Sequence, residues 1–341
     1  MDPIKFGKDL ARKADLAHSL ATQKFEWPDL SGQSLVFMGM GSSAFAANSM
    51  VTKLQACGNN ATFTLSSNPT PPQANTSKTL IAISATGNSV ETNAAFDSAD
   101  GYKEKIWVTN AALRGSRTVA MNAGEETGGV ASLSYLATHI ALLRLYESLG
   151  CISGLEKSID LAADAIADIY SHKEMWLPEL INHIKSPAGS YYIAPADRFC
   201  NAQQSALMMR ESPRLPSVPC ETGDWSHIDV YLTKTLDYRA ILFPGSKWED
   251  QLFKWTQERG SKVMTIGFDH PHATSSIRYK NDSDPLVRLL AETTFAEILA
   301  QHLWVVRDSN PRPGDLESYS NLSLTLKHCY TASLSLLTHS Q

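Results

Sequence analysis

A cluster of hydroxyl side chains follows an apolar segment of strand length at residues 80–83. Ser84 ends this segment, and Thr86, Asn88 and Ser89 follow it closely. Asn88 and Ser89 suit the cap of a helix that starts there. At such a turn, free backbone N–H groups, the helix dipole and hydroxyl donors all favour an anion. Because no Lys or Arg lies in the turn, the sequence predicts a phosphate-type anion that is held by neutral donors.

A second turn of the same kind follows the apolar segment 34–38. Gly39 and Gly41 allow the backbone to turn tightly, and Ser42 and Ser43 can direct hydroxyl and N–H groups at the same anion. The turn lacks the third glycine of a dinucleotide-binding G-x-G-x-x-G fingerprint. Ligands of doubly wound folds lie at the carboxyl ends of strands, so the two turns are predicted to meet at one pocket.

Strand-like and helical segments alternate along the chain, which predicts an α/β fold with parallel sheets and helices on both faces. Two halves of similar organisation indicate a tandem duplication, with one domain at 1–152 and another at 153–341. The expected strands are 34–38, 61–66, 79–84, 105–109 and 117–120, then 190–194, the start of 238–246, and 262–266. The expected helices are 3–25, 132–149, 155–184, 202–211, 247–259 and 285–306.

Composition narrows the class of protein. With 341 residues, 43% apolar and 19% charged, the chain resembles an ordinary two-domain globular protein. A net charge of -5 gives no basic surface for nucleic acid. No apolar run of about 18 residues predicts a membrane span, and no apolar signal segment opens the sequence, so we expect a cytoplasmic protein.

Cysteine and histidine spacing predicts neither a metal site nor a cofactor. The cysteines are odd in number and lack metal-ligand spacing, which favours free thiols in a reducing cytoplasm. His139 and His302 lie on apolar helices and are expected to be packing residues. The five cysteines are Cys57, Cys151, Cys200, Cys220 and Cys329.

Five motifs in this order resemble those of the double SIS-domain (sugar isomerase) phosphosugar proteins, which include the isomerase half of glucosamine-6-phosphate synthase. They are the segments 39–43, 84–92, 129–132, 209–227 and 310–313, so the resemblance spans roughly residues 30–318. It implies two tandem SIS domains, each a three-layer, flavodoxin-like sandwich, in a homodimer with no cofactor. It also implies an anionic sugar as ligand, with the substrate contacts Gly41, Ser42, Ser43, Ser84, Thr86, Asn88, Ser89, Val130 and Ser132.

The resemblance places the catalytic pair at Glu211 and His227, which keep the family spacing of sixteen residues. Glu211 would be the base that moves a proton between C1 and C2 of a sugar through an enediol, with a pKa raised by partial burial. His227, reaching the site from the other subunit, would open the sugar ring. The alternative for Glu211 is a helix-end carboxylate paired with Arg210 or Arg214; for His227, it is an ordinary loop histidine.

Other polar residues near these two have possible roles. Arg210 or Arg214 can stabilise a developing oxyanion, and Glu221 either contacts sugar hydroxyls or caps its own loop. Trp225 can stack on a sugar, line a subunit interface or fill the core. By contrast, the carboxylates at 125 and 126 are interpreted as solvated loop charges.

The chain departs from the family pattern at three positions. Met208 replaces a lysine three residues before the catalytic Glu, Ile228-Asp229 replaces a Gly-Pro, and Ser318 replaces a C-terminal lysine. These losses argue against amino transfer and imine chemistry. The sequence therefore favours an isomerase of a phosphorylated or sulfonated hexose. A deaminase or deglycase of amino-sugar 6-phosphates and a non-catalytic phosphosugar-binding protein are the alternatives, and the tail 319–341 has no assigned role.

Overall fold

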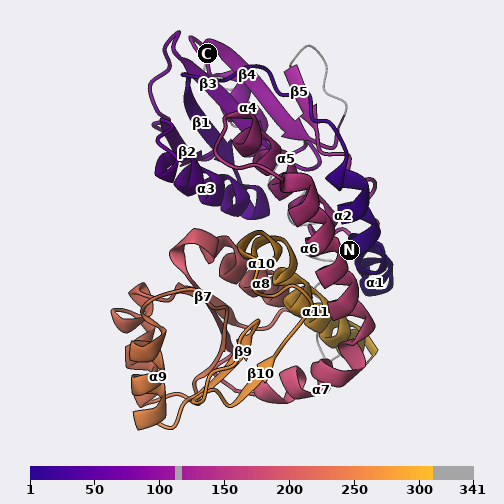
Figure 1. Cartoon of the computed structure of the whole chain (residues 1–341), viewed down its shortest axis with the longest axis vertical. Coiled ribbons are helices and arrows are strands. Elements are labelled where there is room, and N and C mark those ends of the chain that lie inside the picture. Colours follow the sequence, from indigo (N-terminus) through magenta and orange to yellow (C-terminus); the bar gives the residue numbers. More distant parts are fainter. Residues whose placement is uncertain (112–116, 310–341) are drawn as a thin grey trace, which may run out of the picture.

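The computed structural model of the chain describes residues 1–111 and 117–309. Figure 1 shows two α/β halves, one above the other, with the helices α8, α10 and α11 between their sheets. None of the described helices combines the length and apolar character that crossing a membrane requires. The motif at 310–313, Ser318 and the tail 319–341 lie outside the described residues.

Each half contains one parallel five-stranded sheet, and the two sheets have the same topology. The first has the order β2-β1-β3-β4-β5 and the second β10-β9-β8-β6-β7. Read from β7, the second order repeats the 2-1-3-4-5 order of flavodoxin-like folds, so the predicted fold class is confirmed. The strands of the first sheet are β1 (Ser34–Gly39), β2 (Ala61–Leu65), β3 (Lys78–Ile83), β4 (Glu104–Thr109) and β5 (Arg117–Ala120). Those of the second are β6 (Ser190–Ala194), β7 (Ser217–Glu221), β8 (Arg239–Leu242), β9 (Lys262–Ile266) and β10 (Ser275–Ile277).

Helices cover both faces of each sheet. Alternate strand residues point to opposite faces, and both sets are apolar here, so each face packs against helices. In the first half, Val36 and Leu80 pack with α4 (Val90–Asp97). Their neighbours Phe37 and Ile81 instead pack toward α3 (Gly41–Ala56) and α5 (Leu133–Ser148). The second half repeats these layers with α9 (Glu249–Glu258) outside and α8 (Phe199–Glu211), α10 (Pro285–Ala291) and α11 (Thr293–Ser309) inside. The inner faces of both sheets share one continuous apolar core.

The N-terminal segment packs on the second half of the chain. It forms two helices, α1 (Pro3–Ala11) and α2 (Lys13–Ala21), where the sequence predicted one helix at 3–25. Helix α1 contacts α11, and α2 contacts α6 (Leu155–Ser171), which is followed by α7 (Lys173–His183). The predicted helix 285–306 is likewise divided, at Glu292, into α10 and α11. The boundary between 152 and 153 stays a prediction.

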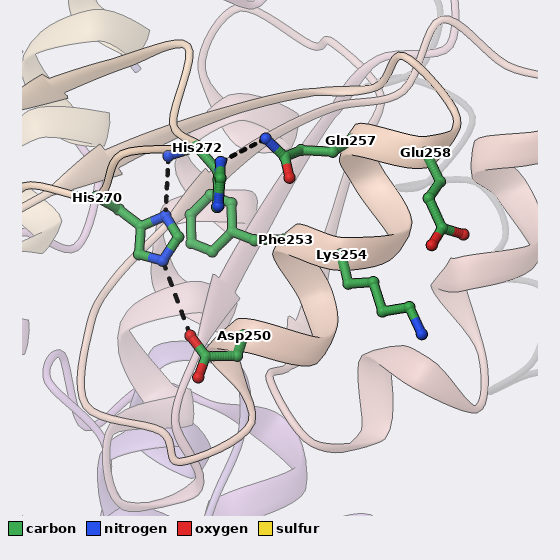
Figure 2. Close-up of a pocket in the computed structure, with 7 residues that line it drawn as sticks. All are labelled: Asp250, Phe253, Lys254, Gln257, Glu258, His270 and His272. Carbon is green, nitrogen blue, oxygen red and sulfur yellow. Dashed lines mark hydrogen bonds and ion pairs between the residues drawn. The ribbon is translucent and has the colours of Figure 1, made fainter.

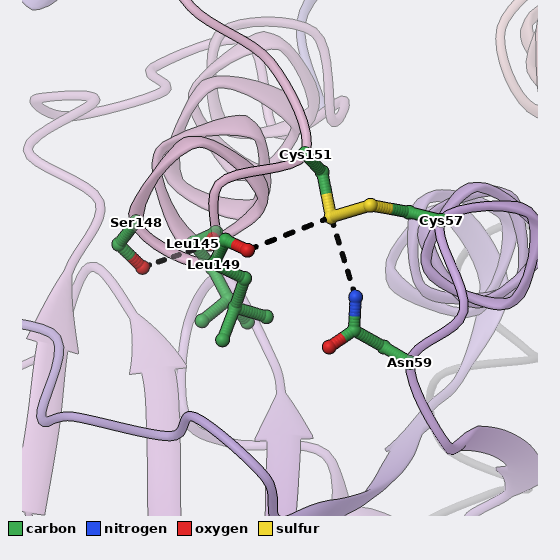
Figure 3. The surroundings of a disulfide bond; sticks show 6 residues. All are labelled: Cys57, Asn59, Leu145, Ser148, Leu149 and Cys151. Atoms are coloured by element: carbon green, nitrogen blue, oxygen red, sulfur yellow. Dashed lines mark hydrogen bonds between the residues drawn. A yellow bond between two sulfur atoms is a disulfide. The ribbon is translucent and has the colours of Figure 1, made fainter.

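Two cysteines form a disulfide, so the prediction of five free thiols is wrong. Cys57 at the end of α3 is bonded to Cys151 after α5, as Figure 3 shows. Asn59 Nδ2 donates to the sulfur of Cys151 at 3.3 Å. Cys200 and Cys220 are free and buried, and Cys329 lies outside the described residues. The disulfide removes the argument for a reducing compartment that rested on free thiols.

Candidate functional site

The turn after β3 forms the first part of the candidate site. Gly87 adopts a left-handed backbone conformation (φ 67°), which residues with a Cβ atom rarely adopt. The N–H of Asn88 donates to Thr86 Oγ1 at 3.2 Å, and Ser89 caps α4 by accepting the N–H of Thr92 at 3.2 Å. Ser84 is buried at the end of the strand, whereas Thr86 and Asn88 are exposed. The turn therefore keeps exposed polar groups at the carboxyl edge of the sheet.

A further hydroxyl, which the sequence did not single out, joins this turn. Ser66 follows β2, and its Oγ lies 3.1 Å from Thr92 Oγ1, which is 3.0 Å from Ser89 Oγ. Three hydroxyls from two strand ends thus form one hydrogen-bonded chain. Sheet topology could have suggested Ser66, because β2 and β3 flank β1.

The start of α3 forms the second part of the site. Gly39 is closely packed: a Cβ there would lie 3.1 Å from the carbonyl oxygen of Ile83, so a side chain would require its neighbours to shift by a few tenths of an ångström. Gly41 begins α3 with φ 53°, and Ser42 and Ser43 are half-buried in its first turn. Since β1 and β3 are paired in parallel, this turn and the turn at 84–89 lie at the same edge of the first sheet.

Helix α8 carries Glu211 to this same edge. Cys200, near its start, lies beside Ser49 in the second half of α3. Further along, Gln204 Nε2 donates to the carbonyl of Ala131 at 2.8 Å, in the loop after β5. Helix α8 therefore runs toward the carboxyl edge of the first sheet, and Glu211 at its end lies beside the loop that contains Glu126. Helix α8 thus directs Glu211 toward the edge of the first sheet at which both anion turns lie.

The environment of Glu211 favours its neutral form. Burial raises the pKa of Glu211, and the neighbouring charge of Glu126 raises it further, as expected from its half-buried position. Arg210 is exposed, and its Nε donates to the carbonyl of Ala206 at 3.2 Å. Arg214 is exposed in a left-handed conformation (φ 57°).

The loop from 125 to 134 is more buried than the sequence suggested. Glu126 is not a solvated charge: it is half-buried, and its carboxylate accepts the N–H groups of Ser132 (2.7 Å) and Ser134 (3.1 Å). Val130 is buried. Ser132 is also buried, and its hydroxyl donates to Glu297 at 2.9 Å. In this arrangement the Ser132 hydroxyl is occupied within the protein.

His227 does not lie beside Glu211 in the same chain. It is exposed in the loop after β7, whereas α8 must end near the start of β7 because β6 and β7 are parallel. The five residues of β7 span roughly 16 Å. The two predicted catalytic residues thus lie at opposite ends of β7.

The other polar residues of the 221–229 loop have structural partners. Glu221 Oε2 accepts the N–H of Asp224 at 2.8 Å, so it caps its own loop. Trp225 is fully buried, and its Nε1 donates to the hydroxyl of Tyr238 at 2.9 Å. That hydroxyl donates in turn to Asp229 at 3.1 Å. Trp225 is therefore a core residue, one of the alternatives from the sequence.

The corresponding turns of the second half are occupied by the chain's own charged side chains. The turn after β8 corresponds to the turn at 84–89, and there the N–H groups of Gly245 and Ser246 donate to Glu249 Oε1 at 2.6 and 2.8 Å. The buried guanidinium of Arg198, after β6, donates to the carbonyl of Pro244 and to Glu292. Glu249 and Arg198 thus occupy the two turns of the second half that correspond to the anion turns of the first half.

A cavity of about 300 Å³ beside α9 contains two histidines (Figure 2). His270 stacks on Phe253 with 3.6 Å between ring centroids, and its Nδ1 accepts the N–H of His272 at 3.2 Å. Its Nε2 faces Asp250 at 3.9 Å. Within residues 1–111 and 117–309, no cluster of three or more His, Cys, Asp or Glu could hold a metal ion.

The two histidines on apolar helices are placed differently. His139 is buried edge-on against Tyr135, and burial lowers its pKa to about 3. It is therefore neutral at neutral pH and packs as predicted. His302 is half-buried beside a cavity of about 500 Å³ that is lined by residues of α1, α7 and α11.

No protein-family model and no curated protein match the chain, but solved structures match its fold. The C-terminal domain of glucosamine-fructose-6-phosphate aminotransferase from Francisella tularensis matches with a TM-score of 0.72 at 12% identity, over 89% of this chain and 96% of that one. Glucosamine-6-phosphate deaminase from Thermotoga maritima matches with a TM-score of 0.67 at 14% identity, over 89% and 95%. Tagatose-6-phosphate ketose/aldose isomerase from Escherichia coli matches with a TM-score of 0.64 at 14% identity, over 92% of both chains. The chain therefore has the two-domain fold of the phosphosugar isomerases, the fold that its motifs predicted.

Proposed function

We propose that this protein is an aldose–ketose isomerase that acts on a phosphorylated hexose, or on a hexose with a similar anionic group such as a sulfonate. One observation supports the proposal most: α8, which ends at Glu211, a carboxylate with a raised pKa, runs toward the sheet edge at which the two hydroxyl-rich turns lie. The turns would bind the anion through Gly41, Ser42, Ser43, Ser84, Thr86, Asn88 and Ser89. Val130 and Ser132 are the further sugar contacts expected from the same chain. Glu221 ends β7 on the side of His227, so it would contact the sugar only from a partner subunit.

The proposed reaction moves two protons within the sugar, one between the carbons C2 and C1 and one between their oxygens. The carboxylate of Glu211 removes the proton from C2 of the open-chain aldose, which gives an enediolate, and then returns a proton to C1. The hydroxyl proton of O2 passes to O1, which gives the ketose. A raised pKa makes the carboxylate a stronger base while it can still ionise near neutral pH. Arg210 or Arg214 would stabilise the oxyanion in place of the lysine that Met208 replaces.

A second copy of the chain completes the proposed site. His227 lies at the far end of β7 from Glu211, so ring opening by His227 requires the histidine of a partner. The protein would then be a homodimer with two sites at the subunit interface. We propose no cofactor, nucleic-acid partner or membrane partner. The cytoplasmic location stays a prediction from the sequence, and the Cys57–Cys151 disulfide argues against it.

A deaminase or deglycase of amino-sugar 6-phosphates is the second candidate. It is supported by the fold match to a protein that is described as a glucosamine-6-phosphate deaminase. A non-catalytic phosphosugar-binding protein is the third candidate. Met208 and Ile228-Asp229, which replace residues of the family's catalytic segment, would be consistent with a loss of catalysis. The three candidates share the anion turns and differ in what happens at Glu211.

Proton NMR in D2O with a panel of anionic hexoses tests the proposal. The panel contains the 6-phosphates of glucose, fructose, mannose, tagatose and glucosamine, and a 6-sulfonated hexose. An isomerase replaces the C2 proton with deuterium and converts one sugar into another, whereas a deaminase releases ammonia from glucosamine 6-phosphate. Binding without turnover would favour the binding protein, and no binding at all would contradict the anion turns.

The variant Glu211→Gln identifies the base. We expect turnover to fall about 10²–10⁴-fold while the affinity for the sugar phosphate stays close to the wild-type value, because the anion turns are unchanged. Glu156→Gln, an exposed carboxylate in the first turn of α6, is the matched control. Full activity of Glu211→Gln would contradict its role as the base.

A further inference from the structure

A groove of about 640 Å³ lies on the outer face of the first sheet, in the upper half of Figure 1. Helix α4 forms one side of it, and the segment 66–74, which follows β2, forms the other. Met38 of β1 and Leu80 of β3, two buried side chains of the outer apolar cluster, form its floor. This volume falls within the range of about 300–1,000 Å³ that is typical of small-molecule sites.

The groove exists because α4 presents small side chains to it. Ala94, Ala95 and Ala99 line the groove in and just after α4, where larger side chains would fill the space. The large side chains of this layer do not line the groove. Phe96 of α4 and Trp107 of β4 instead pack together, with 4.5 Å between their ring centroids.

The opposite wall of the groove is held in place by hydrogen bonds at both of its ends. Near β2, Asn68 Nδ2 donates to Thr64 Oγ1 at 3.0 Å. At the far end, the hydroxyl of Tyr102 donates to the carbonyl of Pro72 at 2.9 Å. A wall that is already fixed reduces the free energy that ordering would cost when a ligand enters.

Most of the hydroxyl groups that line the groove are engaged within the protein. Ser66 Oγ lies 3.1 Å from Thr92 Oγ1, and Ser98 Oγ donates to a backbone carbonyl of α4 at 2.8 Å. The hydroxyls of Thr64 and Tyr102 form the hydrogen bonds of the opposite wall. A ligand would therefore meet mainly apolar side chains in the groove rather than free hydroxyl donors.

The charged side chains of the groove are acidic. Glu91 and Asp100 line it and are exposed, and none of its described lining residues is Lys, Arg or His. The lysines of the neighbouring strands have other partners, since Lys78 Nζ and Lys105 Nζ donate to backbone carbonyl groups at 2.6 and 2.7 Å. The groove should therefore attract a cation and repel an anion.

We propose that this groove binds a small amine with an apolar body. The body would lie on Met38 and Leu80, and the ammonium group would face Glu91 or Asp100. Burial of the apolar body would supply most of the affinity, whereas the carboxylates would select the charge of the ligand. The proposal does not rest on the isomerase function, because none of the residues that line the groove is a predicted residue of that site.

Three naphthalene probes test the proposed chemistry of the ligand. Naphthylmethylamine is a cation at neutral pH, naphthylmethanol is uncharged and naphthoate is an anion. Calorimetry with the full-length protein measures their affinities. We expect the amine to bind roughly fivefold more tightly than naphthoate, with the alcohol between them, because exposed carboxylates contribute modestly. Glu91→Gln and Asp100→Asn should each reduce this difference and leave the affinity for the alcohol unchanged.

NMR signals of ¹³C-labelled alanine methyl groups show where the amine binds. The signals of Ala94, Ala95 and Ala99 should shift when it is added, whereas that of Ala167, an exposed residue of α6, should not. Ala94→Leu should weaken the binding of all three probes roughly tenfold, because the added side chain fills part of the groove. Ala167→Leu is the matched control and should bind the probes as the wild type does.

Several results would overturn the proposal. Equal affinities for the amine and for naphthoate would do so, as would methyl shifts confined to alanines outside the groove. A wild-type protein that binds none of the three probes would also contradict it. If Ala94→Leu does not fold, the methyl shifts of the wild type decide where the amine binds.

Discussion

Lys13 and Glu297 form a fully buried ion pair that joins α2 to α11. The Lys13 Nζ lies 2.5 Å from Glu297 Oε2, and both side chains are 0% exposed. Glu297 also accepts the hydroxyls of Ser132 and Thr293. This carboxylate therefore links the N-terminal helices, the loop of the candidate site and the second half of the molecule.

Loss of the Lys13 charge should destabilise the protein strongly. We expect Lys13→Met to lower the free energy of unfolding by about 3–5 kcal/mol, because an uncompensated carboxylate is left in the core. Urea unfolding measures the change. The double variant Lys13→Met/Glu297→Gln should recover most of it, since the amide keeps partners for the two hydroxyls. Lys8→Met, an exposed lysine in α1, is the control, and an equal loss there would rule out the ion pair as the cause.

For single residues, the sequence predicted contacts between residues that are close along the chain, but not contacts between residues that are far apart along it. The hydroxyl turn at 84–89 was predictable because its contacts are local. The burial of Glu126 was not, because it depends on a loop fixed by Asp9, 119 residues from its partner Gly128. Likewise, nothing near Ser132 in the sequence indicates that its hydroxyl contacts Glu297.

At the scale of elements, the Cys57–Cys151 disulfide ties the end of α3 to the segment after α5. It closes a loop with a sequence separation of 94 residues, so the unfolded chain loses much conformational freedom. The compartment decides whether the bond forms, because cytosolic thiols are kept reduced.

Reduction of this disulfide should lower stability by about 2–5 kcal/mol, which would appear as a lower Tm in thermal unfolding with a reductant. A thiol titration of the unfolded protein should give two more thiols per chain after reduction. The variant Cys57→Ser/Cys151→Ser should unfold at the lower temperature with or without reductant. Equal melting temperatures for oxidised and reduced wild type would show that the bond contributes nothing.

The elements that the sequence missed lie at sheet edges or at helix breaks. Strand β7 contains Pro219, which is tolerated because β7 is an edge strand, and β10 has only three residues. The break at Arg12 between α1 and α2 carries no proline or glycine signal. Apolar periodicity therefore predicted the central strands and long helices, while edges and breaks depend on tertiary packing.

At the scale of the molecule, the two halves repeat one topology but differ at their carboxyl edges. In the first half the turn after β3 keeps Thr86 and Asn88 exposed, whereas Glu249 and Arg198 occupy the corresponding turns of the second half. The alternation of strands and helices predicted the duplication. It could not predict that both sheets share one core, because that core is built from contacts between the halves.

Because β7 separates Glu211 from His227 in one chain, two inactive variants can be expected to restore activity when they form a dimer together. Glu211→Gln and His227→Asn should each be inactive alone, but a randomly mixed population should recover about a quarter of wild-type activity, since half of the dimers are mixed and each has one intact site. Co-expression with two affinity tags and an assay of the doubly tagged dimer measures this rescue. No rescue would mean that each site is built within one chain. Rescue would mean that two alleles, each without function, complement each other in trans.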